Sequence, residues 1–129
     1  MRLVIFALIL FLVPASALAQ VQAGAADALF EQGRVALLKG DLDTACARFT
    51  ASDRLEPSVG ARGSLGDCEE RRGRLASAWA AFRTALELLP PTDARRPVVE
   101  ARIAALAPRL PKLVLQLAPG GDPETVVRE

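Results

Sequence analysis

The sequence predicts an all-α fold, a short solenoid of two similar helical hairpins and a capping helix, followed by a short C-terminal β-hairpin. Two observations predict it. Alanine and leucine dominate the chain and aromatic residues make up 5% of it, a composition that favours helices. Residues 40–49 read GDLDTACARF and residues 73–82 read GRLASAWAAF, so that Gly, Leu, Ala and Phe recur at the same places. The chain therefore contains a repeated helical unit.

Residues 1–19 have the features of a cleaved signal peptide. Arg2 precedes an apolar run over 3–13, Pro14 follows it, and small residues then lead to Ala19, which is the pattern of a signal peptidase site. The run is shorter than the roughly 20 apolar residues that cross a bilayer. We therefore expect export to the periplasm or the medium, with no membrane span after cleavage. An uncleaved signal anchor is the alternative.

The charge of the mature chain argues against two classes of partner. Removing residues 1–19 takes away Arg2 alone among the charged residues and leaves 15 basic and 15 acidic side chains. Nucleic acids and anionic membranes both select a basic surface. We therefore expect no nucleic acid partner, and the length suits one small domain.

Seven pairs of identical residues are each separated by 33 positions. The pairs are Gly33 and Gly66, Gly40 and Gly73, Leu42 and Leu75, Ala45 and Ala78, Phe49 and Phe82, Leu55 and Leu88, and Pro57 and Pro90. They define two repeats, over 26–58 and 59–91, within a helical domain over 26–107. We expect the Gly, Ala and Phe pairs to form the repeat core and the prolines to end each repeat.

Each repeat is predicted to be a helix, a tight turn, a second helix and a stop. In the first repeat, 27–39 and 44–55 carry apolar residues at helical spacing. Gly40 suits the left-handed turn that ends the first helix, and Asp41 is a suitable cap for the second. Pro57 then stops the second helix. Small residues let the two helices approach closely, and a Phe ring fills the space beside them.

The segment over 92–107 is expected to form a capping helix, because stacked repeats need about three units to bury a continuous core. Pro97 is tolerated only near the start of this helix. The residues expected on its inner side are Val98, Val99, Ile103, Ala104 and Leu106.

Residues 112–129 predict a β-hairpin or a truncated β-module. Residues 113–117 read LVLQL and predict a strand, 119–123 read PGGDP and predict a turn, and 124–128 suit a returning strand. A lone hairpin is marginally stable in water, so this tail is either a vestige or docks on another surface.

The repeated unit resembles the tetratricopeptide repeat, which has a similar order of residues at a period of about 34. The second unit shows this order as Leu65-Gly66, Gly73, Ala78, Phe82 and Pro90. The resemblance covers 26–91 and implies a helical array that binds proteins or peptides. The whole arrangement also resembles secreted bacterial repeat proteins that continue into a β-sandwich of the PEGA type. An unrelated bundle of helical hairpins is the alternative.

Cys46 and Cys68 are expected to form a disulfide. Each lies eleven residues from Pro57, the bend between two antiparallel helices, so both lie at the same level. An exported chain meets an oxidising compartment. The alternative is two buried thiols that serve as small apolar residues.

Residues able to carry catalysis are scarce. The chain has no histidine and no tyrosine, which removes the imidazole base and the histidine metal ligand. Asp67, Glu69 and Glu70 are interpreted as a solvated helix face, and the basic run over 71–74 as a helix end. We therefore expect no enzyme activity, no metal site and no cofactor.

The expected function is that of an exported interaction module, a scaffold or adaptor. By the resemblance, a protein or peptide partner binds in the groove lined by the first helix of each unit, with self-association as a further expectation. The alternative is a structural or envelope-associated protein whose C-terminal β-module carries the binding. Phe30 suits the core and the groove equally well. The expected groove residues are Phe30, Arg34, Leu37, Leu38, Asp67, Glu70 and Arg71.

Overall fold

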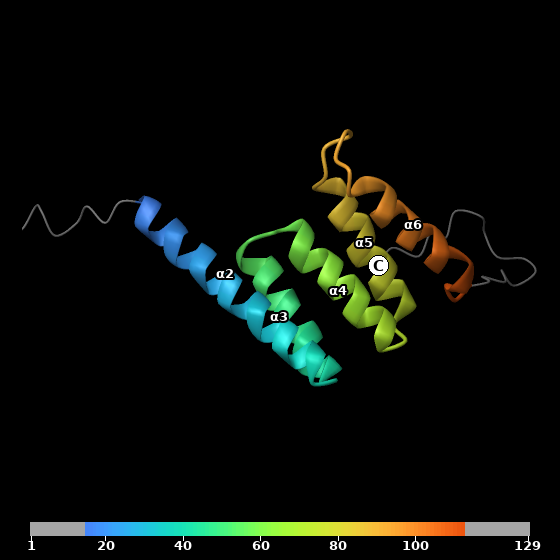
Figure 1. The fold of residues 1–129 in the computed structure, drawn as a ribbon, viewed down its shortest axis with the longest axis horizontal. Coiled ribbons are helices and arrows are strands. Elements are labelled where there is room, and N and C mark those ends of the chain that lie inside the picture. Colours follow the sequence, from blue (N-terminus) through green and yellow to red (C-terminus); the bar gives the residue numbers. More distant parts are fainter. Residues whose placement is uncertain (1–14, 113–129) are drawn as a thin grey trace, which may run out of the picture.

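The computed structural model describes residues 15–112, which form five α-helices and one short 3-10 helix (Figure 1). No strand occurs within this described range. The predicted β-hairpin and residues 1–14 of the predicted signal peptide lie outside it. The elements are α2 (Ala15–Leu38), α3 (Leu42–Leu55), α4 (Val59–Arg71), α5 (Leu75–Glu87), α6 (Arg96–Leu106) and η1 (Ala107–Arg109).

Each helix packs mainly against its neighbours in the sequence. The contacts join α2 to α3, α3 to α4, α4 to α5 and α5 to α6, and Figure 1 shows the helices following one another in that order. Contacts between sequence neighbours are the pattern of helical repeat proteins. Within residues 15–112 the prediction of an all-α fold is confirmed, and the arrangement is compatible with a helical repeat.

The two short turns within the hairpins depend on glycine. Gly40 and Gly73 have φ angles of 77° and 76°, a left-handed conformation that suits a helix C-terminus. Asp41 then caps α3, because its carboxylate accepts a hydrogen bond from the Thr44 N–H at 3.1 Å. The hydroxyl of Ser58 accepts the corresponding bond at the start of α4.

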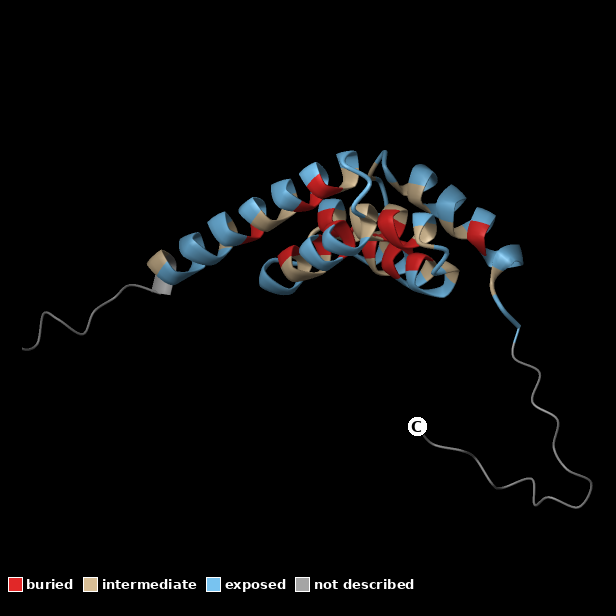
Figure 2. Cartoon of the chain, turned by 90° about the horizontal axis from the view of Figure 1, so that it is seen from below, coloured by how far each residue is buried: buried red, intermediate tan, exposed pale blue. Residues whose placement is uncertain are grey.

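One phenylalanine lies at the centre of each hairpin, against a glycine of the facing helix. A Cβ atom on Gly33 would lie 2.7 Å from the Phe49 ring, and one on Gly66 would lie 2.7 Å from the Phe82 ring. The helices therefore approach each other as closely as they do because these positions carry no side chain. Figure 2 shows the buried residues gathered where the helices face one another.

The buried core forms two clusters, one for each half of the chain. Around Phe49 it contains Ala36, Ala45, Cys46 and Cys68, with Phe30, Leu37 and Leu65 packed against it. Around Phe82 it contains Ala78 and Leu106, with Leu75, Trp79, Val99 and Ile103 packed against it. Most of these buried side chains are small, so each cluster buries little apolar area.

The first helix is longer than the sequence predicts. It begins at Ala15, whereas the apolar spacing predicts a start at Asp27. The added segment is rich in alanine, which has the highest helix propensity, and follows Pro14 directly. Its Leu18 and Val21 side chains are exposed, and Figure 2 shows this end of α2 extending beyond the packed helices.

The capping helix is shorter than predicted. It begins at Arg96 rather than at residue 92, because Asp93 accepts hydrogen bonds from Arg95 in a turn just before it. Pro97 lies in its first turn, as expected. The prediction for its inner side is wrong for Val98 and Ala104, which are exposed.

Replacing Gly66 by Ala tests the close approach of the helices. The new methyl group would overlap the Phe82 ring, and such overpacking costs about 1–3 kcal/mol, more than the roughly 1 kcal/mol that alanine gains in a helix. Urea denaturation is expected to show a lower free energy of unfolding. Gly24→Ala is the matched control, since no described atom lies within 4 Å of its added Cβ, and it is expected to leave stability unchanged or higher. A Gly66→Ala protein as stable as the wild type would contradict this packing.

Candidate functional site

A groove of about 400 Å³ lies between α4 and α6 and is called the α4–α6 groove below. Its α4 wall carries small residues, and its α6 wall carries valines and arginines. Phe82 of α5 also lines it. The lining residues are Val59, Gly60, Gly63, Ser64, Asp67, Phe82, Arg95, Val98, Val99 and Arg102.

A second hollow, of about 310 Å³, lies beside the first between α2 and the start of α4. It includes Phe30 and Glu56, and it shares Gly60 with the α4–α6 groove. The sequence left open whether Phe30 lies in the core or in a groove. The residue lines this hollow, and the centre of its ring also lies 5.5 Å from the centre of the Phe49 ring in the core. The two hollows together follow the N-terminal half of α4.

Of the seven residues expected in the groove, Asp67 lies in the α4–α6 groove and Phe30 in the adjoining hollow. Leu37 packs against the Phe49 cluster, while Leu38 is 87% exposed. Arg34 forms an ion pair with Glu31 on its own helix at 3.1 Å. The structure therefore does not bring Leu37, Leu38 and Arg34 together with Asp67.

Glu70 holds the end of the capping helix against α4. It accepts hydrogen bonds from Arg109 at 2.6 Å and from Arg102 at 3.0 Å. Arg102 also pairs with Asp67, and its guanidinium lies 5.1 Å from the centre of the Phe82 ring. Arg71 is exposed and lines neither hollow. Ion pairs thus join the C-terminal part of α4 to α6 and the 3-10 helix that follows it, beside the groove.

The start of α6 carries a positively charged side chain at the rim of the groove. The Arg95 side chain is 62% exposed and donates two hydrogen bonds to Asp93, at 2.9 Å and 2.8 Å. These bonds lower the pKa of Asp93 to about 2. The first turn of α6 holds no acidic residue, but Asp93, just before it, pairs with the charge of Arg95.

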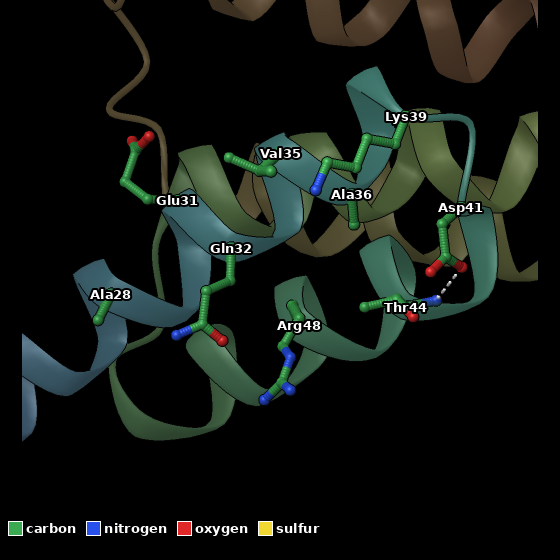
Figure 3. A pocket seen from close by; sticks show the side chains of 9 residues that line it. All are labelled: Ala28, Glu31, Gln32, Val35, Ala36, Lys39, Asp41, Thr44 and Arg48. Carbon is green, nitrogen blue, oxygen red and sulfur yellow. Dashed lines mark hydrogen bonds between the residues drawn. The ribbon is translucent and has the colours of Figure 1, made fainter.

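A third hollow, of about 420 Å³, lies between α2 and α3 (Figure 3). Its lining comes from both helices and the turn between them and mixes alanine and valine with polar residues, with Gln32, Lys39 and Arg48 among the side chains drawn. Asp41 is engaged as the cap of α3, and its hydrogen bonds from Thr44 lower its pKa. The charged groups of this hollow are of both signs, so its charge favours neither anionic nor cationic ligands.

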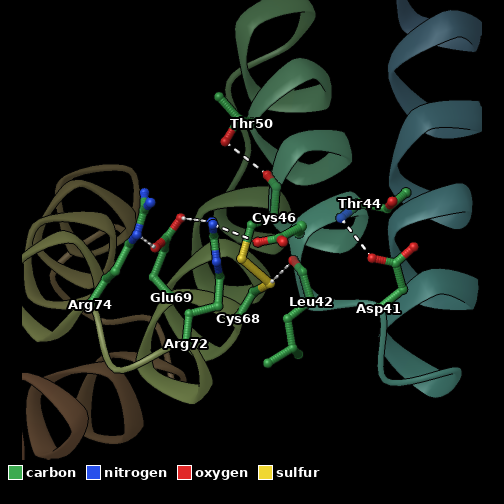
Figure 4. Close-up of a disulfide and its surroundings, with 10 residues drawn as sticks. Asp41, Leu42, Thr44, Cys46, Thr50, Cys68, Glu69, Arg72 and Arg74 are labelled. Carbon is green, nitrogen blue, oxygen red and sulfur yellow. Dashed lines mark hydrogen bonds and ion pairs between the residues drawn. A yellow bond between two sulfur atoms is a disulfide. The ribbon is translucent and has the colours of Figure 1, made fainter.

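The disulfide between Cys46 and Cys68 joins the two hairpins (Figure 4). The Cα atoms are 5.6 Å apart and both residues are buried, in α3 and α4. Arg72 adds an ionic link beside the disulfide, because it contacts Asp43 of α3 at 2.6 Å and Glu69 of α4 at 3.3 Å. The bonded pair is the one that the sequence predicts.

Residues 15–112 show two further properties relevant to function. They contain no group of three or more acidic, cysteine or histidine residues placed to hold a metal ion. No helix within this range is both long enough and apolar enough to cross a membrane.

The sequence-based prediction missed the α6 wall of the groove and the two small residues opposite it. Arg95, Arg102 and Val98 lie in a segment interpreted as a cap, and a cap is expected to cover rather than to bind. Gly60 and Gly63 could have been noticed in the sequence, since two glycines one helical turn apart weaken a helix.

Comparisons with protein-family models, with curated proteins and with solved structures give no match for this chain.

Removing the disulfide is expected to lower the free energy of unfolding by about 3 kcal/mol, the loop-entropy value for cysteines separated by 22 residues. Urea denaturation of wild type and of the Cys46→Ala, Cys68→Ala double variant measures this difference. Thiol titration of the denatured, unreduced wild type should detect no free thiol. Two free thiols, or equal stability of the two proteins, would contradict the crosslink.

Proposed function

We propose that this chain is an exported, non-enzymatic interaction module related to tetratricopeptide repeat proteins, and that it binds an extended segment of a protein partner. The observation that carries the proposal is the α4–α6 groove with the adjoining α2–α4 hollow. The two hollows adjoin at Gly60 on the first helices of successive units, and extended peptides bind in such hollows through a few anchoring side chains.

The repeated residues support the relation to tetratricopeptide repeats. Gly33 and Gly66 admit the Phe49 and Phe82 rings in the same way, so the spacing of 33 in the sequence corresponds to the same packing in both hairpins. The disulfide is compatible with an oxidising, exported location. A continuation into a PEGA-type β-module belongs to the same proposal and concerns residues beyond 112.

Self-association is a second candidate function, favoured by exposed apolar side chains on α2. Val21, Val35 and Leu38 are all exposed on this helix, together with Leu18 before the predicted cleavage site. Association of two copies would remove such apolar side chains from water. The contact would then involve α2 rather than the α4–α6 groove.

A photo-crosslinking amino acid at Val98 tests the groove in the host cell. Val98 lines the groove, whereas Ala80 is exposed on α5 and lines none of the described hollows, so Ala80 is the matched control position. We expect one dominant protein adduct from position 98 and none from position 80, by mass spectrometry. Adducts between copies of the chain alone would support self-association, and identical adducts from both positions would contradict binding in the groove.

A further inference from the structure

Two exposed valines of α2 are placed symmetrically about one alanine. Val21 and Val35 each lie seven residues from Ala28, one on either side, and they are 70% and 49% exposed. Ala28 is exposed as well. An α-helix turns by about 100° per residue, so a step of seven residues returns to within roughly 20° of the starting direction. The three side chains therefore lie in one row along the helix, called the α2 ridge below.

The packing of the described residues leaves the α2 ridge uncovered, because α2 contacts α3 through its other side. The carbonyl of Ala26 accepts a hydrogen bond from the Ser52 hydroxyl of α3 at 2.9 Å. Gly33 faces the Phe49 ring of α3. Both Ala26 and Gly33 point away from the direction of Ala28 in an α-helix. The ridge is thus a second face of α2, free for another contact.

The α2 ridge borders the hollow of about 420 Å³ between α2 and α3 (Figure 3). Ala28 and Val35 of the ridge line this hollow, together with charged side chains of both signs. The mixed charge favours neither an acidic nor a basic neighbour, and the two ridge residues offer apolar surface. An uncharged helix with small and apolar side chains would therefore suit this surface.

The N-terminal end of α2 is itself a helix of that kind. Residues 15–26 include no charged side chain and are rich in alanine. Figure 2 shows this end extending beyond the packed helices. A helical segment of this length without packing is marginally stable in water. Contact with the hollow of a second copy would stabilise the segment and remove Val21 from water.

We propose that two copies of this chain pair through the α2 ridge, with their α2 helices antiparallel and a two-fold axis beside Ala28. Val21 of each copy then lies beside Val35 of the other, because both are seven residues from the axis. The small side chains of Ala28 meet at the centre and allow the helices to approach closely. In a two-fold interface the same patch of both copies meets in this reciprocal way, and the equal spacing of the valines fits it.

An antiparallel pair also uses the free end of α2 and the hollow at once. The N-terminal end of each α2 lies beside the hollow of the other copy, whereas a parallel pair would place the two free ends together. After cleavage at Ala19 the helices overlap over 20–36, roughly 25 Å. This is a small contact, so we expect a weak dimer that depends on protein concentration.

This assignment specifies the surface for the second candidate function, self-association, and rests on it. Partner binding in the α4–α6 groove is separate from it, because the α2 ridge and that groove share no residue.

Single cysteine substitutions in the exported, oxidised protein test the geometry. A mixture of the Val21→Cys and Val35→Cys proteins is expected to form a crosslinked heterodimer under mild oxidation, because the pairing brings these positions together. Neither protein alone should crosslink, since its two equivalent cysteines would lie roughly 21 Å apart along the helices. Ala28→Cys should crosslink with itself. Ala80→Cys, at an exposed position of α5, is the matched control and should not.

Sedimentation velocity over a range of concentrations measures the association itself. We expect the wild type to form a dimer as its concentration rises. Ala28→Glu places two carboxylates against each other at the two-fold axis and is expected to raise the dissociation constant at least tenfold. Its helix content by circular dichroism should match that of the wild type, because position 28 is exposed and glutamate favours helices. Ala80→Glu is the matched control and should keep the wild-type dissociation constant.

The outcomes separate the surface from self-association and from partner binding. A wild type that is monomeric at every concentration would reject self-association and this assignment, and would leave partner binding in the α4–α6 groove unaffected. A dimer that Ala28→Glu does not weaken, or equal crosslinking of Ala28→Cys and Ala80→Cys, would overturn the α2 ridge while self-association would stand. Crosslinking of Val21→Cys with itself would overturn the antiparallel arrangement.

Discussion

The disulfide between Cys46 and Cys68 is the constraint on which the arrangement of this protein depends. Each hairpin is defined locally, by a glycine turn and by a phenylalanine packed on a glycine. The two hairpins meet mainly through α3 and α4, where the disulfide crosses the interface and Arg72 bridges Asp43 and Glu69. The relative position of the hairpins, and with it the hollow between α2 and α4, follows from this joint.

A crosslink has particular value here because the core is small. The largest fully buried side chains are Phe49, Leu106 and the two cysteines, and most of the others are alanines. Short repeat arrays bury little apolar surface, and disulfides commonly stabilise small domains whose cores are of this kind. The ion pairs of Glu70 with Arg102 and Arg109 serve the same purpose at the other end, where they hold α6 on α4.

The sequence predicted those features that depend on neighbours along the chain. The spacing of 33 residues located both hairpins, and equal distances from Pro57 located the cysteine pair. It missed the start of α2, because the alanine-rich segment before Asp27 is helical by propensity and lacks the apolar periodicity of a packed helix. It also missed the α4–α6 groove. That groove arises from the absence of side chains at Gly60 and Gly63 and from the placement of α6, and neither feature produces a periodic pattern of apolar residues in the sequence.

Hydrogen–deuterium exchange of the oxidised and the reduced protein, followed by mass spectrometry, tests most directly whether the disulfide holds the two hairpins together. The account predicts that reduction accelerates amide exchange in α3 and α4, on both sides of the joint. It also predicts that α5 and α6 keep their protection, because the Phe82 cluster and the ion pairs of Glu70 remain. Uniform acceleration across all five described helices, or no change in α3 and α4, would contradict it.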